Sequence, residues 1–382
     1  MRTWLLLLAA AGLTLNADCS AAPPPADAAS PHHRGDGFKN NHVNFQPKGL
    51  AALLAWKWQA MLDGLPRAPQ SPTPRVAPDL AFIAANARAG ARMVPAVTWI
   101  GHASTLLQIG GVNVLTDPIF SERASPIAGL GPKRALPPGL AIEQLPRIDV
   151  VVISHNHYDH LDEASVVALA HQAGGAPVFL VPLGNKAWFE ALGLRSAVEL
   201  DWWQSHHVGA VEFVMTPVQH WSGRGFGDRL QTLWGGWAML APDFSAFFGG
   251  DTGYSPDFAE IDRRLSPRNG GGFDLAILPI GGYAPRWFMA QQHVDPAEAV
   301  RMHRDLRARQ SFGMHWGTFE LTDESLDEPP RAVAVARQAA GVADDEFFVL
   351  AVGESRKLSR RAVATLPGGH ATPRPAAVTQ AP

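Results

Sequence analysis

The chain has 382 residues, of which 46% are hydrophobic and 18% are charged, and its formal net charge is −3. This composition predicts a folded globular protein and excludes a disordered or fibrous chain. The small negative charge and the lack of a basic run argue against a nucleic-acid partner. No internal repeat is evident, so one large domain with appended segments is expected.

Residues 1–22 have the layout of a secretory signal peptide. The apolar stretch at residues 4–15 is too short to span a membrane stably, and small residues follow it at 20–22. The pattern predicts an exported, periplasmic protein. The only cysteine, Cys19, lies in this segment, so no intramolecular disulfide can form. Acylation of Cys19, as in a lipoprotein, is the alternative, although Asp18 is a poor residue before a lipidated cysteine.

The remaining chain divides by composition. Residues 23–46 are rich in Ala, Pro, Asp and His, which predicts a disordered leader, and residues 356–382 predict a largely disordered C-terminal tail. Between them we expect a helical lead at 47–92 and a catalytic domain at 93–355. Within the lead, residues 49–63 predict an amphipathic helix. Packing of this helix on the domain is the favoured interpretation, and contact of its apolar face with a bilayer surface is the alternative.

The most informative stretch is an apolar run at 150–153 that leads into four histidine and aspartate side chains within six residues. The apolar run predicts a buried strand. Because residues i and i+2 of an extended segment face the same way, His155 and His157 can bind one cation. Asp159 and His160, in the next turn, can then reach a second cation. Imidazole and carboxylate ligands without thiolate suit zinc, with iron or manganese as alternatives, so the loop predicts a dinuclear metal hydrolase.

Two coordination shells need more ligands than this loop provides, and later segments supply them. Three strand-like segments each end shortly before a further histidine or aspartate. These segments are 211–216, 244–250 and 310–314, and the residues that follow them are His220, Asp251 and His315. A carboxylate can bridge two cations, whereas an imidazole nitrogen normally binds one. We therefore expect Asp251 to lie between the two metals.

The order of these ligands resembles the metallo-β-lactamase superfamily. The chain further resembles the N-acylphosphatidylethanolamine-hydrolysing phospholipase D family within it, over about residues 45–355. Ten motifs in the same order carry this second resemblance. They lie at residues 98–103, 115–121, 131–134, 154–162, 199–203, 219–221, 250–254, 285–289, 292–296 and 315–319.

The resemblance implies an α/β fold, a four-layer αββα sandwich with two zinc ions at one edge. It implies one zinc bound by His155, His157 and His220, a second bound by Asp159, His160 and His315, and Asp251 between them. The implied reaction cleaves N-acylphosphatidylethanolamine into N-acylethanolamine and phosphatidic acid, by attack of a dizinc-bound hydroxide on phosphorus. Asp159, Asp251 and His293 would be the catalytic residues. Helices expected at 163–173, 185–194, 296–307 and 330–339 alternate with the strands, as such a sandwich requires.

Three further residues are candidates for other roles near the metals. His293 precedes residues 295–298, Asp-Pro-Ala-Glu, which are typical of a helix start. In the loop before that helix, His293 could contact a phosphoryl oxygen or donate a proton to the leaving group, with a capping or supporting histidine as the alternative. Asp117 is expected to orient a ligand histidine, with a simple turn aspartate as the alternative. His102 is expected to be a structural neighbour of the site rather than a ligand.

Tyr283, Arg286 and Trp287 lie in a segment that resembles the lipid enzymes beyond the shared ligands, and we expect them to contact substrate. Arg286, like Lys133 and Arg134, could meet a lipid phosphate, although salt bridges are equally consistent with the sequence. A phospholipid is the expected partner, with peripheral membrane contact and homodimerisation left open.

Two other functions also stay open. The first is a dinuclear metal hydrolase of the same fold that acts on a lactone, a β-lactam or a non-lipid phosphodiester, because function depends on the site rather than on the fold. The second is a non-catalytic binding protein, which the complete set of seven ligands disfavours.

Overall fold

The structure, a computed structural model, describes residues 30–127, 129–225 and 227–360. The predicted signal peptide, Cys19 and the tail beyond residue 360 lie outside the described residues. Among the helices that the structure describes, none is both long and apolar enough to cross a bilayer.

Two seven-stranded sheets form the centre of the fold. In spatial order, the first contains β16 (Ser355–Lys357), β3 (Ala96–Gly101), β4 (Ser104–Ile109), β5 (Val112–Thr116), β6 (Val150–Val152), β7 (Val178–Pro182) and β8 (Ala197–Leu200). The second contains β15 (Phe347–Phe348), β14 (Gln310–Met314), β13 (Leu275–Pro279), β12 (Phe244–Phe248), β11 (Gly236–Ala241), β10 (Val211–Thr216) and β9 (Ser205–Val208). Because β16 pairs with β3, the folded domain continues past its predicted end at residue 355.

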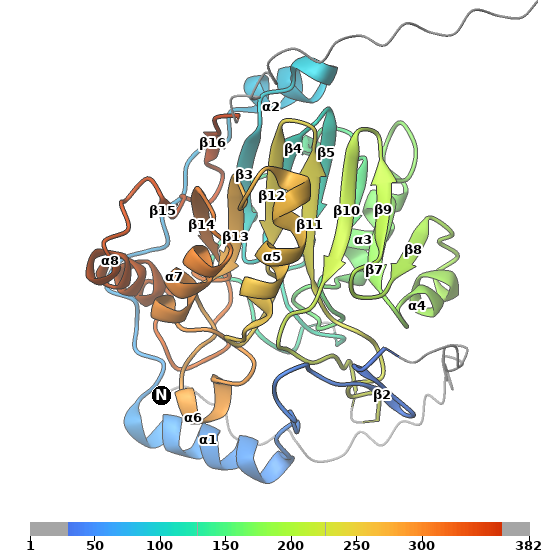
Figure 1. Cartoon of the computed structure of the whole chain (residues 1–382). Coiled ribbons are helices and arrows are strands. Elements are labelled where there is room, and N and C mark those ends of the chain that lie inside the picture. Colours follow the sequence, from blue (N-terminus) through green and yellow to red (C-terminus); the bar gives the residue numbers. More distant parts are fainter. Residues whose placement is uncertain (1–29, 128, 226, 361–382) are drawn as a thin grey trace, which may run out of the picture.

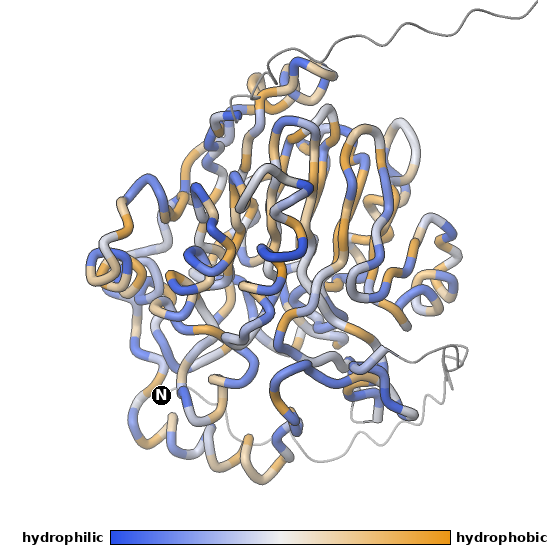
Figure 2. Tube along the Cα trace, in the orientation of Figure 1, coloured by the Kyte–Doolittle hydropathy of each residue, from blue (hydrophilic) through white to orange (hydrophobic). Residues whose placement is uncertain are grey.

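Successive side chains of a strand point to opposite faces of its sheet, so the hydrophobic core of the sandwich consists of two main clusters. Val150 and Val152 of β6 pack between the two sheets, in one cluster with Phe247 of β12. Val151 points to the other face of its sheet and packs in a second cluster with Val166 of α3 (Glu163–Ala170). All are fully buried, and burial of each such side chain stabilises the fold by roughly 1.5–3 kcal/mol. Figure 2 shows the corresponding concentration of apolar residues in the strands.

Helices cover the outer face of each sheet. On the first sheet lie α2 (Leu80–Ala87), α3 and α4 (Lys186–Ala191), and on the second lie α5 (Asp257–Asn269), α7 (Pro296–Asp305) and α8 (Glu328–Ala340). Figure 1 shows α5 and α7 in front of the sandwich and α3 behind it. The predicted αββα sandwich is confirmed. The four helices predicted after residue 93 correspond to α3, α4, α7 and α8. α2 lies within the predicted helical lead at 47–92, and α5 has no counterpart among the predictions.

The strand directions place the carboxyl ends of several strands at one edge of the sandwich. β12, β13 and β14 run parallel, and β10 runs in the same direction because antiparallel β11 separates it from β12. In the other sheet β5 and β6 are also parallel. The segments that follow β6, β10, β12 and β14 hold the predicted ligands, so the topology can gather them at the same edge.

Residues 30–46 have a defined structure, which corrects the predicted disordered leader over that range. They contain a hairpin of β1 (His33–Arg34) and β2 (Gly37–Phe38). His32 and His33 hydrogen-bond the two carboxylate oxygens of Asp201 through Nε2, at 2.6 and 2.8 Å. These contacts join residues 169 and 168 positions apart, so local composition carries no sign of them. We call residues 30–48 the N-terminal strap.

α1 (Leu50–Asp63) agrees with the predicted helix at 49–63 and lies beside α6 (Arg286–Met289) (Figure 1). It buries only Trp56 and Ala60, against Phe288 and Met289. Its exposed apolar side chains are Leu50, Leu53, Leu54, Trp58, Met61 and Leu62. The expected packing on the domain therefore holds for one narrow face, and most of the apolar surface of α1 faces outward.

Candidate metal centre

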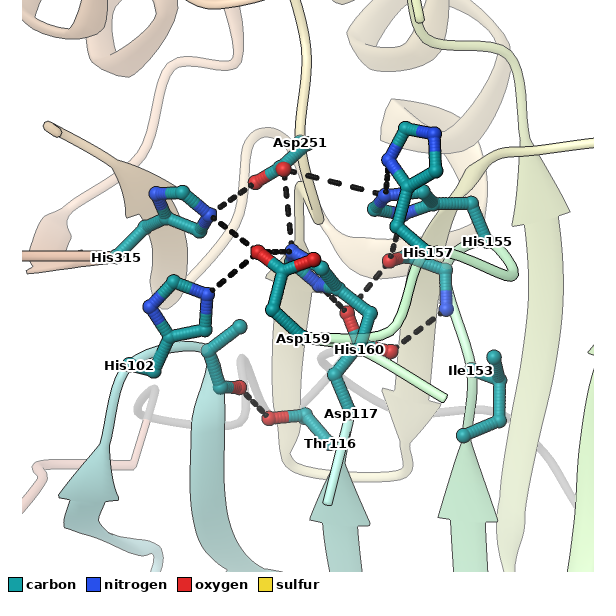
Figure 3. A network of polar contacts seen from close by, with 12 residues as sticks. His102, Thr116, Asp117, Ile153, His155, His157, Asp159, His160, Asp251 and His315 are labelled. Atoms are coloured by element: carbon teal, nitrogen blue, oxygen red, sulfur yellow. Dashed lines mark hydrogen bonds and ion pairs between the residues drawn. The ribbon is translucent and has the colours of Figure 1, made fainter. Parts of the chain in front are cut away.

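Four segments bring the seven predicted ligands together. His155, His157, Asp159 and His160 follow β6, His220 follows β10, Asp251 follows β12, and His315 follows β14. In Figure 3, Asp251 lies between His315 on one side and His155 on the other, with His160 below it. The ligand atoms form two adjacent groups. We call His155, His157 and His220 subsite A, and Asp159, His160 and His315 subsite B.

In subsite A the three ligand nitrogens lie within 4.8 Å of one another. His155 Nε2 is 2.8 Å and His220 Nε2 is 3.4 Å from His157 Nδ1. Burial lowers the pKa of His157 to about 4 and that of His220 to about 3, and it holds the pKa of His155 well below its usual range. The three rings are therefore neutral near pH 7 and keep nitrogen lone pairs for a cation, as metal binding requires.

In subsite B, His160 Nε2 and His315 Nε2 lie 3.4 and 3.7 Å from Asp159 Oδ2. Burial opposes a charge on His315, but Asp251 and Asp159 outweigh it and raise the pKa of His315 to about 9. The pKa of His160 is also raised, since burial is outweighed by Asp251, Asp159 and Asp117. In the metal-free protein a proton thus takes the place that a cation would occupy.

Asp251 faces both subsites. Its Oδ1 lies 3.1 Å from His315 Nε2, and its Oδ2 lies 3.1 Å from His160 Nε2. The same Oδ2 is 3.9 Å from His155 Nε2 and 4.0 Å from His220 Nε2. The carboxylate is buried, so it could bridge two cations as the sequence predicts.

Asp117 contacts a predicted ligand, as expected. Its Oδ2 accepts from His160 Nδ1 at 2.6 Å, and its two oxygens also accept from the backbone N–H and the hydroxyl of Ser154. Because the bond uses Nδ1 of His160, Nε2 is left to face subsite B. A carboxylate in this position fixes both the tautomer and the orientation of the ring.

His102 is closer to the centre than the sequence suggests. Its Nε2 lies 2.9 Å from Asp159 Oδ2, and its carbonyl accepts from the backbone N–H of His315 at 3.1 Å. Burial, followed by the neighbouring His315, lowers the pKa of His102 to about 3, so a neutral ring donates Nε2–H to Asp159. His102 and His315 both have positive φ angles, 53° and 63°, which are uncommon outside glycine. The position of His102 directly after a strand, as for the ligands, was the available signal.

His293 lies at the edge of the centre, with Nε2 3.8 Å from Asp251 Oδ2. It precedes α7, whose N-terminus has the predicted capping box of Asp295 and Glu298. Burial lowers the pKa of His293 to about 3, although Asp251 opposes the shift. The ring is therefore partly buried and neutral, and its Nδ1 lacks a hydrogen-bond partner in the part of the chain that the structure describes.

Two of the three predicted substrate contacts have hydrogen-bond partners within the protein. The Arg286 guanidinium is held by its own chain, because it donates to His293 O and Glu298 Oε2 at 2.7 Å each. Tyr283 is buried and its hydroxyl donates to Glu328 at 2.6 Å. Substrate contact by these two side chains stays a prediction. Trp287 alone is exposed, at 58%.

The two other cationic candidates also have protein contacts. Lys133 pairs with Glu122 at 2.6 Å, and Arg134 is buried, with Nη2 3.3 Å from Ile119 O. Lys133 therefore forms the salt bridge that the sequence left as the alternative to lipid phosphate.

The residues present fit divalent transition metals. Five imidazoles and two carboxylates, without thiolate, suit zinc, iron or manganese. Among the described residues, His160 Nε2, His315 Nε2 and Asp251 Oδ1 lack a hydrogen bond of good geometry, and His160 and His315 contact Asp251 only as ion pairs. A bound cation would satisfy these buried polar atoms.

A αββα sandwich with this edge cluster is the architecture of a metal-dependent hydrolase of the metallo-β-lactamase fold. Residues 112–316 match the model of the beta-lactamase superfamily domain, and the chain belongs to that superfamily.

The chain is similar to known proteins in sequence and to solved structures in fold. It is 37% identical over 276 residues to the N-acyl-phosphatidylethanolamine-hydrolyzing phospholipase D 1 of Caenorhabditis elegans, covering 69% of this chain and 76% of that protein. It is 39% identical over 347 residues to an uncharacterized protein of Mycobacterium tuberculosis, covering 88% of this chain and 87% of that one. The fold resembles an isothiocyanate hydrolase from Delia radicum gut bacteria, with a TM-score of 0.53, 19% identity, and coverage of 69% of this chain and 100% of that one.

Proposed function

We propose that this protein is a dizinc phosphodiesterase that hydrolyses N-acylphosphatidylethanolamine to N-acylethanolamine and phosphatidic acid. The observation that carries the proposal is the pair of adjacent subsites with Asp251 facing both. The 37% identity to a nematode protein named for this reaction supports the choice of substrate. Bound metals would lower the pKa of a water and offset the charge that builds on the phosphorus oxygens.

In this proposal, some residues bind the metals and others orient the ligands. Subsite A would hold one zinc and subsite B the other, with Asp251 shared and Asp159 at the reacting edge of subsite B. Asp117 orients His160 through Nδ1, and His102 donates a hydrogen bond to Asp159.

His293 would meet the phosphodiester through Nε2. The negative charge of the substrate would raise its pKa, which burial otherwise lowers, and so allow it to give a proton to the departing ethanolamide oxygen. Arg286 supports this role indirectly, because its guanidinium holds the backbone carbonyl of His293.

A lipid substrate must reach the centre from a membrane, and the outward face of α1 suits that task. We propose that α1 and Trp287 contact the bilayer surface. Trp58 and Trp287 are 59% and 58% exposed, and α1 packs on α6, which directly precedes the His293 loop. An apolar helix face that lies in the interface plane binds by burial of its apolar area.

The test is release of both products from mixed vesicles of phosphatidylcholine and N-acylphosphatidylethanolamine, followed by mass spectrometry. The zinc-loaded protein should release N-acylethanolamine and phosphatidic acid in equal amounts, and the His155→Ala variant should release neither. Intact lipid with a folded protein that has bound its metals would contradict the substrate assignment. A lactone, a β-lactam and a soluble phosphodiester, tested in parallel, would then identify the bond class.

A further inference from the structure

Asn40, in the N-terminal strap, binds both backbone polar groups of His220 in subsite A. Its side-chain Nδ2 donates to His220 O at 2.8 Å, and its Oδ1 accepts from His220 N at 3.0 Å. The same Oδ1 accepts from the indole of Trp234 at 3.1 Å. Asn40 is 5% exposed and His220 is 1% exposed, so these bonds are shielded from water.

His220 needs such support because it lies outside regular secondary structure. β10 ends at Thr216, four residues earlier, and no sheet ladder reaches His220. The ring itself is fixed at one atom, since Nδ1 lies 2.9 Å from Gln292 O, which leaves Nε2 for subsite A. The ring bond and the two backbone bonds together set where Nε2 points.

The strap is anchored on both sides of Asn40. On one side, His32 and His33 hold Asp201. On the other side, Phe45 stacks on Trp221, the residue after His220, with ring centroids 6.2 Å apart, and Lys48 donates to Phe288 O at 3.1 Å. Asn40 is thus held in place by contacts that do not involve the metal ligands.

We propose that Asn40 is a positioning residue for subsite A, so that the strap, which lies before the matched domain at 112–316, completes the metal centre. Groups that orient a metal ligand through hydrogen bonds typically change metal affinity by about 10–100-fold when removed. This inference rests on the metal centre proposed above but not on the identity of the substrate.

The experiment measures the zinc content of the full chain, and the rate of zinc loss to a chelator, for Asn40→Ala and Asn41→Ala. Asn41 is the matched control, because it is the next residue of the strap and its amide donates to Asp257 at 2.8 Å rather than to a ligand. Asn40→Ala should lose one zinc about 10-fold faster or more and keep the zinc of subsite B. Asn41→Ala should match the wild type.

Loss of both metals together would indicate general loosening of the fold and would overturn the proposal, as would an Asn40→Ala variant that keeps both zincs at the wild-type rate. If Asn40→Ala does not fold, the His32→Ala/His33→Ala double variant decides, because it removes the anchor on the N-terminal side of Asn40 without touching His220. Faster loss of the subsite A zinc from that variant supports the proposal, and wild-type retention overturns it. A wild-type chain that binds fewer than two metals contradicts the metal centre itself, whereas inert lipid with normal zinc retention contradicts only the substrate.

Discussion

Asp117 and His160 form a buried hydrogen bond of 2.6 Å between carboxylate Oδ2 and imidazole Nδ1. Replacing Asp117 by Asn removes the charge and breaks the match between acceptor and ring N–H, so we expect metal affinity at subsite B to fall by about 10–100-fold. Competition with a metal indicator measures this.

Asp162→Asn is the matched control for Asp117→Asn. Asp162 lies two residues after His160 and caps α3 by accepting from Ser165 N. Because asparagine caps a helix about as well as aspartate does, this substitution should leave both the stability and the metal content nearly unchanged. Equal metal retention in both variants would contradict the role of Asp117.

Asp251→Ala should abolish turnover and lower the metal content below two per chain, because the Asp251 carboxylate lies within 4.0 Å of ligand nitrogens in both subsites. Elemental analysis of the dialysed protein tests this. Asp243→Ala, which alters a carboxylate paired with Arg360, should keep both metals. An active Asp251→Ala variant with full metal content would refute the bridging role.

His293→Ala should keep both metals while slowing catalysis by about 10²–10⁴-fold, the usual contribution of a proton donor. The ring lies 3.8 Å from Asp251 but is absent from subsites A and B. Steady-state rates together with metal content separate the two roles. If the variant loses a metal, His293 is a ligand or the support of one.

Metal binding should release protons near neutral pH. In the metal-free protein the raised pKa of His315, about 9, means that its ring is protonated at about pH 7, and a cation must displace that proton. Calorimetry in buffers of different ionisation enthalpy should therefore find more protons released at about pH 7 than at about pH 10. Equal release at both would show that subsite B does not hold the proton.

The raised pKa of His315 also predicts that the stability of the metal-free protein depends on pH. A group whose pKa rises from 6.5 to about 9 on folding contributes stability that is fully present below pH 6.5. That contribution is lost as the pH rises through about 9. Thermal unfolding of the metal-free protein across this range measures it.

Charges on the outward face of α1 should weaken vesicle binding. Leu54 and Trp58 are 51% and 59% exposed, and each would lose apolar burial in the interface if replaced by Glu. We expect the double variant to bind vesicles on the order of 10-fold more weakly, measured by flotation. Val335→Glu, at an exposed apolar position of α8, should bind as the wild type does. Unchanged vesicle binding by the α1 variant would show that this face of α1 is not the membrane contact.

The candidate ligands were predictable because their signal is local: an apolar strand followed by a histidine or aspartate at its carboxyl end. The topology then gathers those ends, as at β6 and β14. The strap was not predictable from composition, since its structure depends on Asp201 and His220, which lie far along the chain. The partners of Arg286 and Tyr283, Glu298 and Glu328, were likewise not predictable from the motif.

The most direct test of the account is a titration of the metal-free protein with zinc, with lipid turnover followed against bound zinc per chain. The account predicts negligible turnover without metal and a rise to the full rate as the second zinc binds, because Asp251 joins two occupied subsites. Full turnover in the metal-free protein, or none with both zincs bound, would contradict it.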